Sequence, residues 1–167
     1  MALTIKRNGF GQVEPNHLSA QRTGQIYAQL PADSSIETIE NGMFLYYNYA
    51  SGKVTKTGDG EPMLVLNEVK LYDTARETYK DFAMEKKNYL NGEMVPRLFK
   101  TNVGDIFTTN MLVKGDATTV TEGAELTPNA NGILDNENTS DAEMIWKVVK
   151  VYTMADGQDA VKVQRIK

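Results

Sequence analysis

The chain has no cysteine and a single histidine among its 167 residues. The lack of cysteine excludes a disulfide scaffold, thiolate zinc sites, iron–sulfur clusters and a cysteine nucleophile. The one histidine, His17, excludes metal sites built from several histidines, and it gives little support for a hydrolytic triad, which needs a nucleophile held by an oriented base. We therefore expect no enzyme activity, no cofactor and no resident metal.

Long apolar runs and basic clusters are also lacking. No run approaches the roughly 20 residues that a membrane helix needs, and the first nine residues lack the apolar core of a secretion signal. The formal net charge is −4, with +2 over residues 1–30, −2 over 31–100 and −4 over 101–167. Without a basic stripe, a nucleic-acid partner is not expected. On charge alone, the preferred interpretation of the positive N-terminal segment is that its three cations are solvated, and docking onto an acidic protein surface is the alternative.

Residues 1–35 differ from the rest of the chain in composition. They are rich in Gln, Asn, Ser and Gly and poor in large apolar side chains, so they bury little surface by themselves. We interpret them as an extended N-terminal arm with short strands at Leu3–Lys6 and Gln25–Leu30. Residues 36–167 form the predicted body, which is long enough and apolar enough to hold its own core.

Short strand patterns, separated by glycine-containing turns, fill most of this body. The aromatic run Met43–Tyr49 follows the turn Asn41-Gly42. Two longer patterns, Met144–Met154 and Ala160–Ile166, flank Asp156-Gly157, a dipeptide typical of hairpin turns. Further strands are expected at Lys53–Thr55, Met63–Tyr72, Ile106–Asn110, Thr118–Thr121, Glu125–Thr127 and Ile133–Leu134.

This spacing of strands and turns predicts a mainly β fold, a small barrel or sandwich of short antiparallel strands, with residues 98–167 as its barrel-like part. Only residues 73–90 show a helical period. Lys86 interrupts their apolar stripe, so an irregular loop anchored by tyrosines is the alternative to a helix there. The fold therefore has at most one short helix.

Alternation along Met43–Tyr49 places Tyr47 and Tyr49 on the face opposite Phe44 and Tyr46. We expect the Phe44 face to pack between two sheet layers. Tyr47 and Tyr49 form a candidate surface row that stacks on sugars or anchors an interface.

The densest set of oxygen ligands lies at residues 135–143. An EF-hand loop that begins at Asp135 needs glycine at its sixth position, where Ser140 stands. A solvated acidic loop is the preferred interpretation. A calcium-binding module is the alternative, and it requires Asp135, Glu137 and Asp141 to converge.

Three segments in the second half of the chain together form a pattern of spacing and turns. Lys80-Asp81-Phe82-Ala83 precedes Val95-Pro96-Arg97-Leu98, Val103–Asn110 enters a strand through Gly104-Asp105, and Trp146–Gln164 forms the closing hairpin. Together they span about residues 80–167 and resemble the small auxiliary head proteins of tailed bacteriophages, the decoration or cement proteins that coat a capsid shell. Gly-Asp before an apolar strand recurs in many small barrels, whereas the closing hairpin is more distinctive.

The resemblance implies a structural virion protein, made in the host bacterial cytoplasm, that binds the outer surface of a capsid. Its partners would be the major capsid protein and neighbouring copies of itself, with no nucleic acid and no membrane. The arm lies outside the resemblance, and its docking role is inferred from charge and composition. Within it we expect capsid contacts from Lys6, Arg7, Phe10 and Arg22. The alternative is a phage tail, baseplate or head-fibre component that binds host glycans through Tyr47 and Tyr49.

Overall fold

The computed structural model describes residues 2–5, 7, 9–18, 28–58, 60–67, 82–112, 118–137 and 139–167. This part of the chain is mainly β, with antiparallel sheets, two 3₁₀ turns, no helix of seven or more residues and no closed barrel. The predicted fold class is confirmed. The elements are β1 (Ala2–Ile5), β2 (Val13–His17), β3 (Ala28–Gln29), β4 (Thr38–Glu40), β5 (Phe44–Asn48), β6 (Lys53–Thr55), β7 (Met63–Val65), β8 (Ala83–Glu85), η2 (Lys86–Asn88), η3 (Leu90–Gly92), β9 (Arg97–Phe99), β10 (Ile106–Thr109), β11 (Thr118–Thr121), β12 (Glu125–Pro128), β13 (Leu134–Asp135), β14 (Trp146–Thr153) and β15 (Asp159–Arg165).

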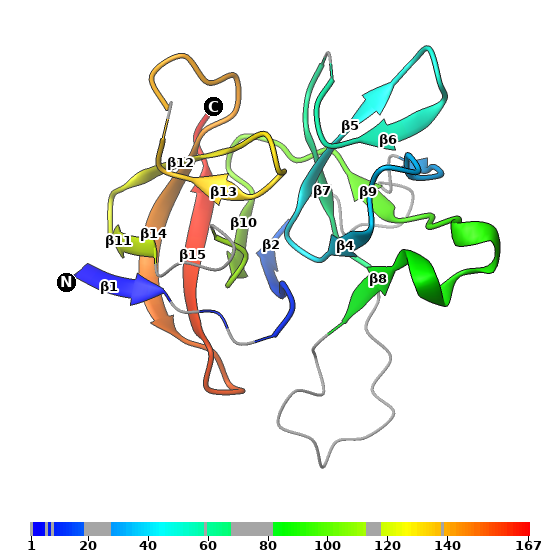
Figure 1. Cartoon of the computed structure of the whole chain (residues 1–167). Coiled ribbons are helices and arrows are strands. Elements are labelled where there is room, and N and C mark those ends of the chain that lie inside the picture. The colour runs from blue at the N-terminus through cyan, green and yellow to red at the C-terminus, as the bar shows by residue number, and fades with distance from the viewer. Residues whose placement is uncertain are drawn as a thin grey trace.

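Two larger sheets organise these strands. A six-stranded sheet has the order β13-β12-β14-β15-β10-β2, and a five-stranded sheet has the order β3-β9-β7-β5-β6. Two further pairs, β1 with β11 and β4 with β8, complete the fold. In Figure 1, β11–β15 gather on the left and β4–β9 on the right, with β10 and β2 between them.

The closing hairpin β14–β15 is the longest strand pair of the fold. It turns at Asp156-Gly157, where Gly157 takes a φ of 83° that suits glycine, so the predicted hairpin is confirmed. Its register shifts between Val148 and Lys150, which marks a β-bulge. The bulge changes which side chains of β14 face the core.

Strands β5 and β7 separate two hydrophobic cores because their side chains alternate between faces. Phe44 and Leu64 join one core, while Leu45 and Met63 join the other. We call the first the aromatic core, since Phe44 packs there against Phe107 and Trp146 of the six-stranded sheet, with ring centroids 4.8–6.4 Å apart. We call the second the methionine core, since it buries five methionines: Met43, Met63, Met84, Met94 and Met111.

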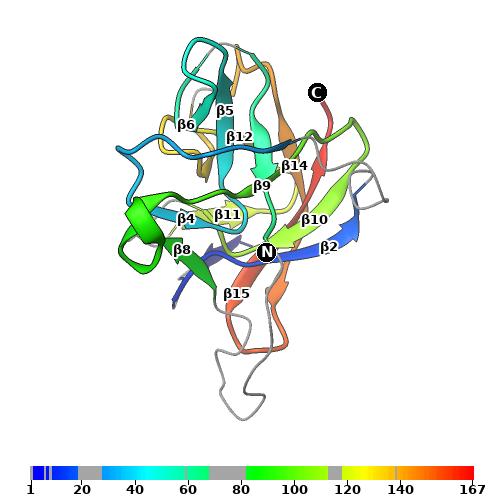
Figure 2. The same cartoon turned by 90° about the vertical axis from the view of Figure 1, so that its right-hand side faces the viewer.

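The N-terminal segment contributes to this body. The predicted strand Leu3–Lys6 corresponds to β1, and Val13–His17 forms a further strand, β2, which the sequence analysis did not predict. Strand β2 lies beside β10 at the edge of the six-stranded sheet (Figure 2), where Pro15 is tolerated because one side of an edge strand donates no ladder hydrogen bond. Of the predicted strand Gln25–Leu30, residues 25–27 lie outside the described part.

The helical interpretation of residues 73–90 fails over its described part. Residues 82–90 contain β8 and the 3₁₀ turn η2, while residues 73–81 lie outside the described residues. Strand β8 pairs with β4, so Met84 faces Ile39 and both enter the methionine core. Of the strand predicted at Met63–Tyr72, Met63–Val65 forms β7 and residues 66–67 are not in a strand, while residues 68–72 lie outside the described part.

Candidate interaction surfaces

The predicted capsid contacts of the N-terminal segment have different environments. Lys6 and Arg22 lie outside the described residues. Arg7 is only 10% exposed; its Nη1 donates to Glu40 Oε2 at 2.6 Å and lies 2.8 Å from Met111 Sδ. Phe10 is half-buried, and its carbonyl accepts a hydrogen bond from Asn110. Arg7 therefore ties the N-terminal segment to the body instead of presenting its charge to an outside partner.

Glu40 is a charged group at the centre of this contact. Its side chain is 2% exposed, and Oε2 also accepts a hydrogen bond from the Gly11 amide at 2.8 Å. A buried carboxylate is stable only when cations and donors replace its lost hydration. Gly11 lies so close to Asn41 and Met111 that it has no room for a side chain. Pairing and close packing together fix this segment against β4.

A polar network links the same segment to the turn of the closing hairpin. The Gln12 amide donates to Asn110 Oδ1 at 2.6 Å, and the Gln12 side chain donates to Asp156 at 2.9 Å. Gln158 donates to the same carboxylate at 3.0 Å. Burial alone would raise the pKa of Asp156, but these hydrogen bonds outweigh it and hold the pKa below its usual value.

The candidate aromatic row is a pair of tyrosines at the end of β5. Tyr47 and Tyr49 pack edge to face with centroids 4.6 Å apart. Tyr49 is 75% exposed, whereas Tyr47 is half-buried against the methionine core. Only Tyr49 offers a largely free ring to a partner.

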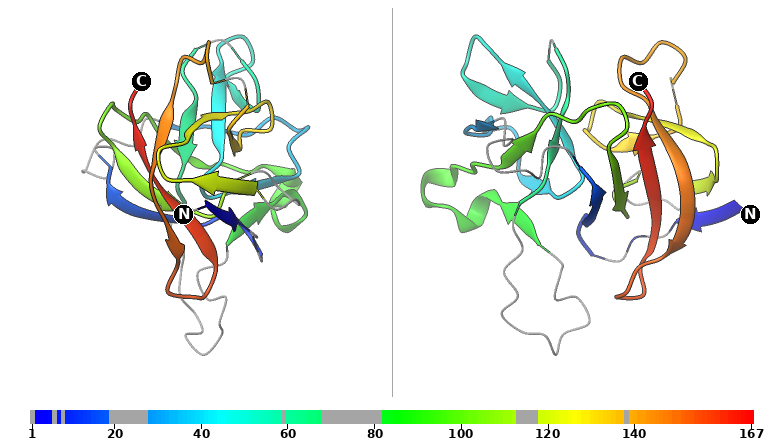
Figure 3. Two further views of the ribbon diagram at one scale, coloured as in Figure 1. Left: turned by 90° about the vertical axis from the view of Figure 1, so that its left-hand side faces the viewer. Right: turned by 180° about the vertical axis from the view of Figure 1, so that it is seen from behind.

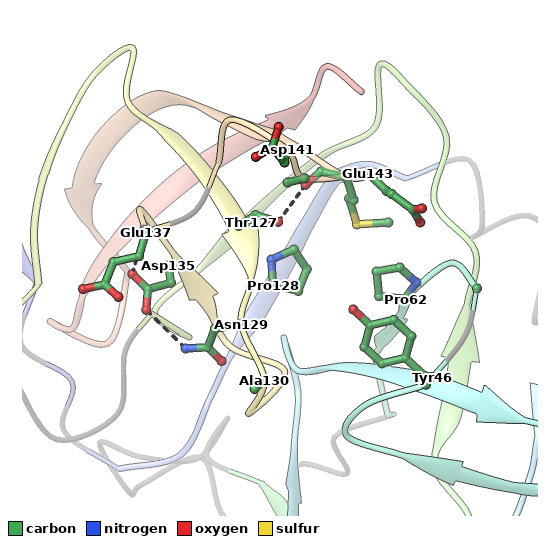
Figure 4. A pocket seen from close by; sticks show the side chains of 14 residues that line it. Tyr46, Pro62, Thr127, Pro128, Asn129, Ala130, Asp135, Glu137, Asp141 and Glu143 are labelled. Atoms are coloured by element: carbon green, nitrogen blue, oxygen red, sulfur yellow. Dashed lines mark hydrogen bonds between the residues drawn. The ribbon is translucent and has the colours of Figure 1, made fainter.

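An open cleft of about 750 Å³ lies between β5 and the segments around β12 and β13. Asp135 and Glu137 lie on one side and Tyr46 and Pro62 on the other (Figure 4). Gly132 O accepts a hydrogen bond from Phe44 N at 2.7 Å and so holds the loop after β12 against β5. The full lining is Tyr46, Gly58, Gly60, Pro62, Thr127, Pro128, Asn129, Ala130, Asp135, Glu137, Asp141, Ala142, Glu143 and Met144.

The carboxylates of the cleft do not form a metal centre. Asp135 is held by Asn129 at 3.2 Å and accepts the Glu137 amide at 3.2 Å, while Asp141 stands apart from both (Figure 4). Among the described residues no group of three or more acids, histidines or cysteines is placed to hold a metal ion. The calcium-binding alternative therefore lacks the convergence that it requires. Burial raises the pKa of Tyr46, and the Glu143 carboxylate raises it further.

A second surface is the outer face of the closing hairpin, which the sequence analysis missed. Strands β14 and β15 are nearest the viewer in the right-hand view of Figure 3. We call this surface the lysine face, and define it by Lys147, Lys150, Tyr152 and Lys162. Lys150 and Lys162 are direct partners across the strands, and each ammonium lies 5.8 Å from the centroid of the Tyr152 ring. Burial raises the pKa of Tyr152; its hydrogen bond with Thr108 acts in the opposite direction, and Glu14 adds to the increase.

The distribution of charged residues along the sequence indicates that the closing hairpin is positive. Residues 115–145 carry seven acidic and no basic residues, whereas residues 146–167 carry five basic and two acidic residues. A count over residues 101–167 as one block conceals this contrast. The closing hairpin is therefore a positive segment of a negative chain.

Within the described residues, no helix is long and apolar enough to cross a membrane.

Comparison with known proteins gives no match for this chain among protein-family models, curated proteins or solved structures.

Proposed function

We propose that this protein is a structural virion protein that binds the outer surface of a bacteriophage capsid and stabilises or decorates the shell through non-covalent contacts with the major capsid protein. The observation that carries the proposal is the closing hairpin. The segment Trp146–Gln164 is the most distinctive part of the resemblance to decoration proteins, and it forms the longest strand pair. One face of this pair enters the aromatic core, and the other carries the lysine face.

A rigid platform suits this role. Trp146 and Phe107 are fully buried and pack edge to face at 4.8 Å, so the hairpin rests on a fixed core. A protein that acts on many equivalent sites of a shell gains from avidity, and a preformed surface keeps the ordering cost of each contact low. Neighbouring copies on the shell are the second expected partner.

The N-terminal segment enters the proposal in a changed form. Strands β1 and β2 belong to the sheets, so deletion of residues 1–24 is expected to disturb the fold as well as any contact. Arg7 is paired internally with Glu40. Lys6, Phe10 and Arg22 remain predicted contacts, and single substitutions at these positions test them better than truncation does.

The direct test is the copy number in purified particles. Virions from the source lysate are analysed by quantitative mass spectrometry of this chain against the major capsid protein. A shell-wide decoration protein gives a ratio of roughly one to one or one to three, because it follows the symmetry of the shell. A handful of copies per particle would favour a tail or fibre role, and absence from particles would contradict the proposal.

Exposure of Tyr49 favours a second candidate, a tail, baseplate or head-fibre component that binds host glycans. Its ring is 75% exposed at the end of β5, and aromatic rings of this kind stack on sugars. A glycan-array experiment with wild-type protein and a Tyr49→Ala variant tests it. Binding that the substitution abolishes would support this candidate, and no glycan binding by the wild type would eliminate it.

A further inference from the structure

The lysine face has an unusual charge arrangement. Lys150 and Lys162 stand directly opposite each other on β14 and β15, although like charges at such positions repel. Two carboxylates border the face: Glu125, opposite Lys147 on β12, and Glu14, whose Oε2 lies 3.4 Å from the Tyr152 hydroxyl. Among the described residues, no carboxylate forms an ion pair with Lys150 or Lys162. No carboxylate of the described residues therefore neutralises either ammonium.

Tyr152 holds this arrangement in place. Its hydroxyl donates to Thr108 Oγ1 at 2.6 Å, and Thr108 Oγ1 in turn donates to Asn16 Oδ1 at 2.7 Å. The chain of hydrogen bonds crosses from β14 through β10 to β2, and Thr108 is fully buried beneath the ring. The ring is therefore fixed, and the ammonium groups of Lys150 and Lys162 lie over it at equal distances.

We infer that the lysine face is the docking surface for an acidic protein surface, in which carboxylates of the partner bind between Lys150 and Lys162. The inference rests on the proposed function and makes that partner the outside of the capsid. Charge complementarity carries it, because the face presents the cations Lys147, Lys150 and Lys162 in a chain of net charge −4. Three lysines flanked by Glu14 and Glu125 are too few to follow a phosphate backbone, so a protein fits this face better than a nucleic acid.

The test is co-sedimentation of purified protein with capsids that lack it. The variant Lys150→Glu/Lys162→Glu reverses the charge of the face, and Lys53→Glu/Lys56→Glu makes the same charge change on the five-stranded sheet. We expect the first variant to bind at least about tenfold more weakly and the second to bind within about threefold of the wild type. Lys150→Arg/Lys162→Arg, which keeps both charges, is expected to bind like the wild type.

Thermal unfolding of each variant separates loss of binding from loss of fold, since both substituted positions are on the surface. Normal capsid binding by a folded Lys150→Glu/Lys162→Glu variant would overturn the inference and leave the proposed function intact. Loss of self-association with unchanged capsid binding would also overturn it, by assigning the face to contacts between copies. If the wild-type protein itself does not bind capsids, the proposed function fails and the inference fails with it.

Discussion

The two cores of the molecule are built from different side chains. The aromatic core contains Phe44, Phe107 and Trp146 with a single methionine, whereas the methionine core contains five methionines and no fully buried aromatic ring. Aromatic rings are rigid and fit one arrangement, while methionine is unbranched and fills irregular space. The six-stranded sheet therefore rests on fixed packing, whereas the five-stranded sheet, whose strands β5 and β7 lie between the two cores, has fixed packing on one face and adaptable packing on the other.

The two cores also lie beneath different parts of the molecular surface. The lysine face lies on the outside of the sheet that covers the aromatic core. The methionine core lies beneath short strands such as β4 and β8, which the chain joins over long sequence separations. A docking surface needs a fixed support, and short strands of irregular length need a core that tolerates imperfect fit. On the proposed function, the aromatic core would give the lysine face this fixed support.

The strongest test of this comparison is one substitution in each core. Trp146→Ala removes the central ring of the aromatic core and is expected to lower the free energy of unfolding by about 3–5 kcal/mol. Met63→Leu, at an equally buried site of the methionine core, should cost less than about 1.5 kcal/mol. Urea unfolding measures both. A matched pair, Trp146→Phe and Met63→Leu, makes each change conservative, and equal costs in this pair would contradict the comparison.

The second prediction concerns the contact that fixes the N-terminal segment beside the methionine core. Arg7→Leu removes the Arg7 cation from the buried Glu40 carboxylate and should cost about 3 kcal/mol. The double variant Arg7→Leu/Glu40→Gln removes the charge as well and should recover a large part of the loss. Urea unfolding of the wild type, Arg7→Leu, Glu40→Gln and the double variant completes the cycle. Additive effects of the two substitutions would show that Arg7 and Glu40 act independently.

The third prediction uses pH to examine the turn of the closing hairpin. The pKa of Asp156 in the folded protein lies below its unfolded value near 3.8, so its carboxylate stabilises the fold above that pH. This stability is lost as the pH falls through the lowered pKa. Asp156→Asn should reduce the free energy of unfolding by up to about 1 kcal/mol at pH 7, since the carboxylate is half-buried and partly screened by solvent. The difference from wild type should shrink below about pH 4, which urea midpoints at a series of pH values would reveal.

Features set by local sequence were predictable. The strands Lys53–Thr55 and Thr118–Thr121 match β6 and β11 residue for residue, and Asp156-Gly157 placed the closing hairpin. Each rests on a turn dipeptide or a run of β-branched and aromatic residues. The segment Ala83–Glu85 has no such local signal, since it becomes a strand by pairing with Thr38–Glu40, far away in the sequence. The helical spacing of apolar residues around Ala83–Glu85 was outweighed by strand pairing with Thr38–Glu40.

The lysine face was missed for a different reason. Strict alternation puts Lys147 and Lys150 on opposite faces of a strand, because they are three residues apart. The bulge between Val148 and Lys150 inserts one residue and brings both lysines to the outer face. Val149, the extra residue, is left 47% exposed. No residue type in this stretch marks a bulge, so the sequence alone could not place the two lysines together.

The smallest predicted effect concerns the lysine face, on the outside of the sheet that covers the aromatic core. Lys162→Glu replaces a like-charged cross-strand pair with an opposite-charged one, which favours folding by about 0.2–1 kcal/mol. The loss of one cation–π contact with Tyr152 opposes this by about 0.5 kcal/mol. We therefore expect a net gain of a few tenths of a kcal/mol in urea unfolding at low salt, decreasing at high salt because surface charges are screened. Lys162→Gln, which removes the charge without reversing it, should gain less than Lys162→Glu. A variant that is more stable yet binds capsids more weakly would mean that the lysine pair is kept for contact with a partner, at the expense of the sheet that carries it. Lower stability of Lys162→Glu at low salt would instead assign the two lysines a purely structural role over the tyrosine ring.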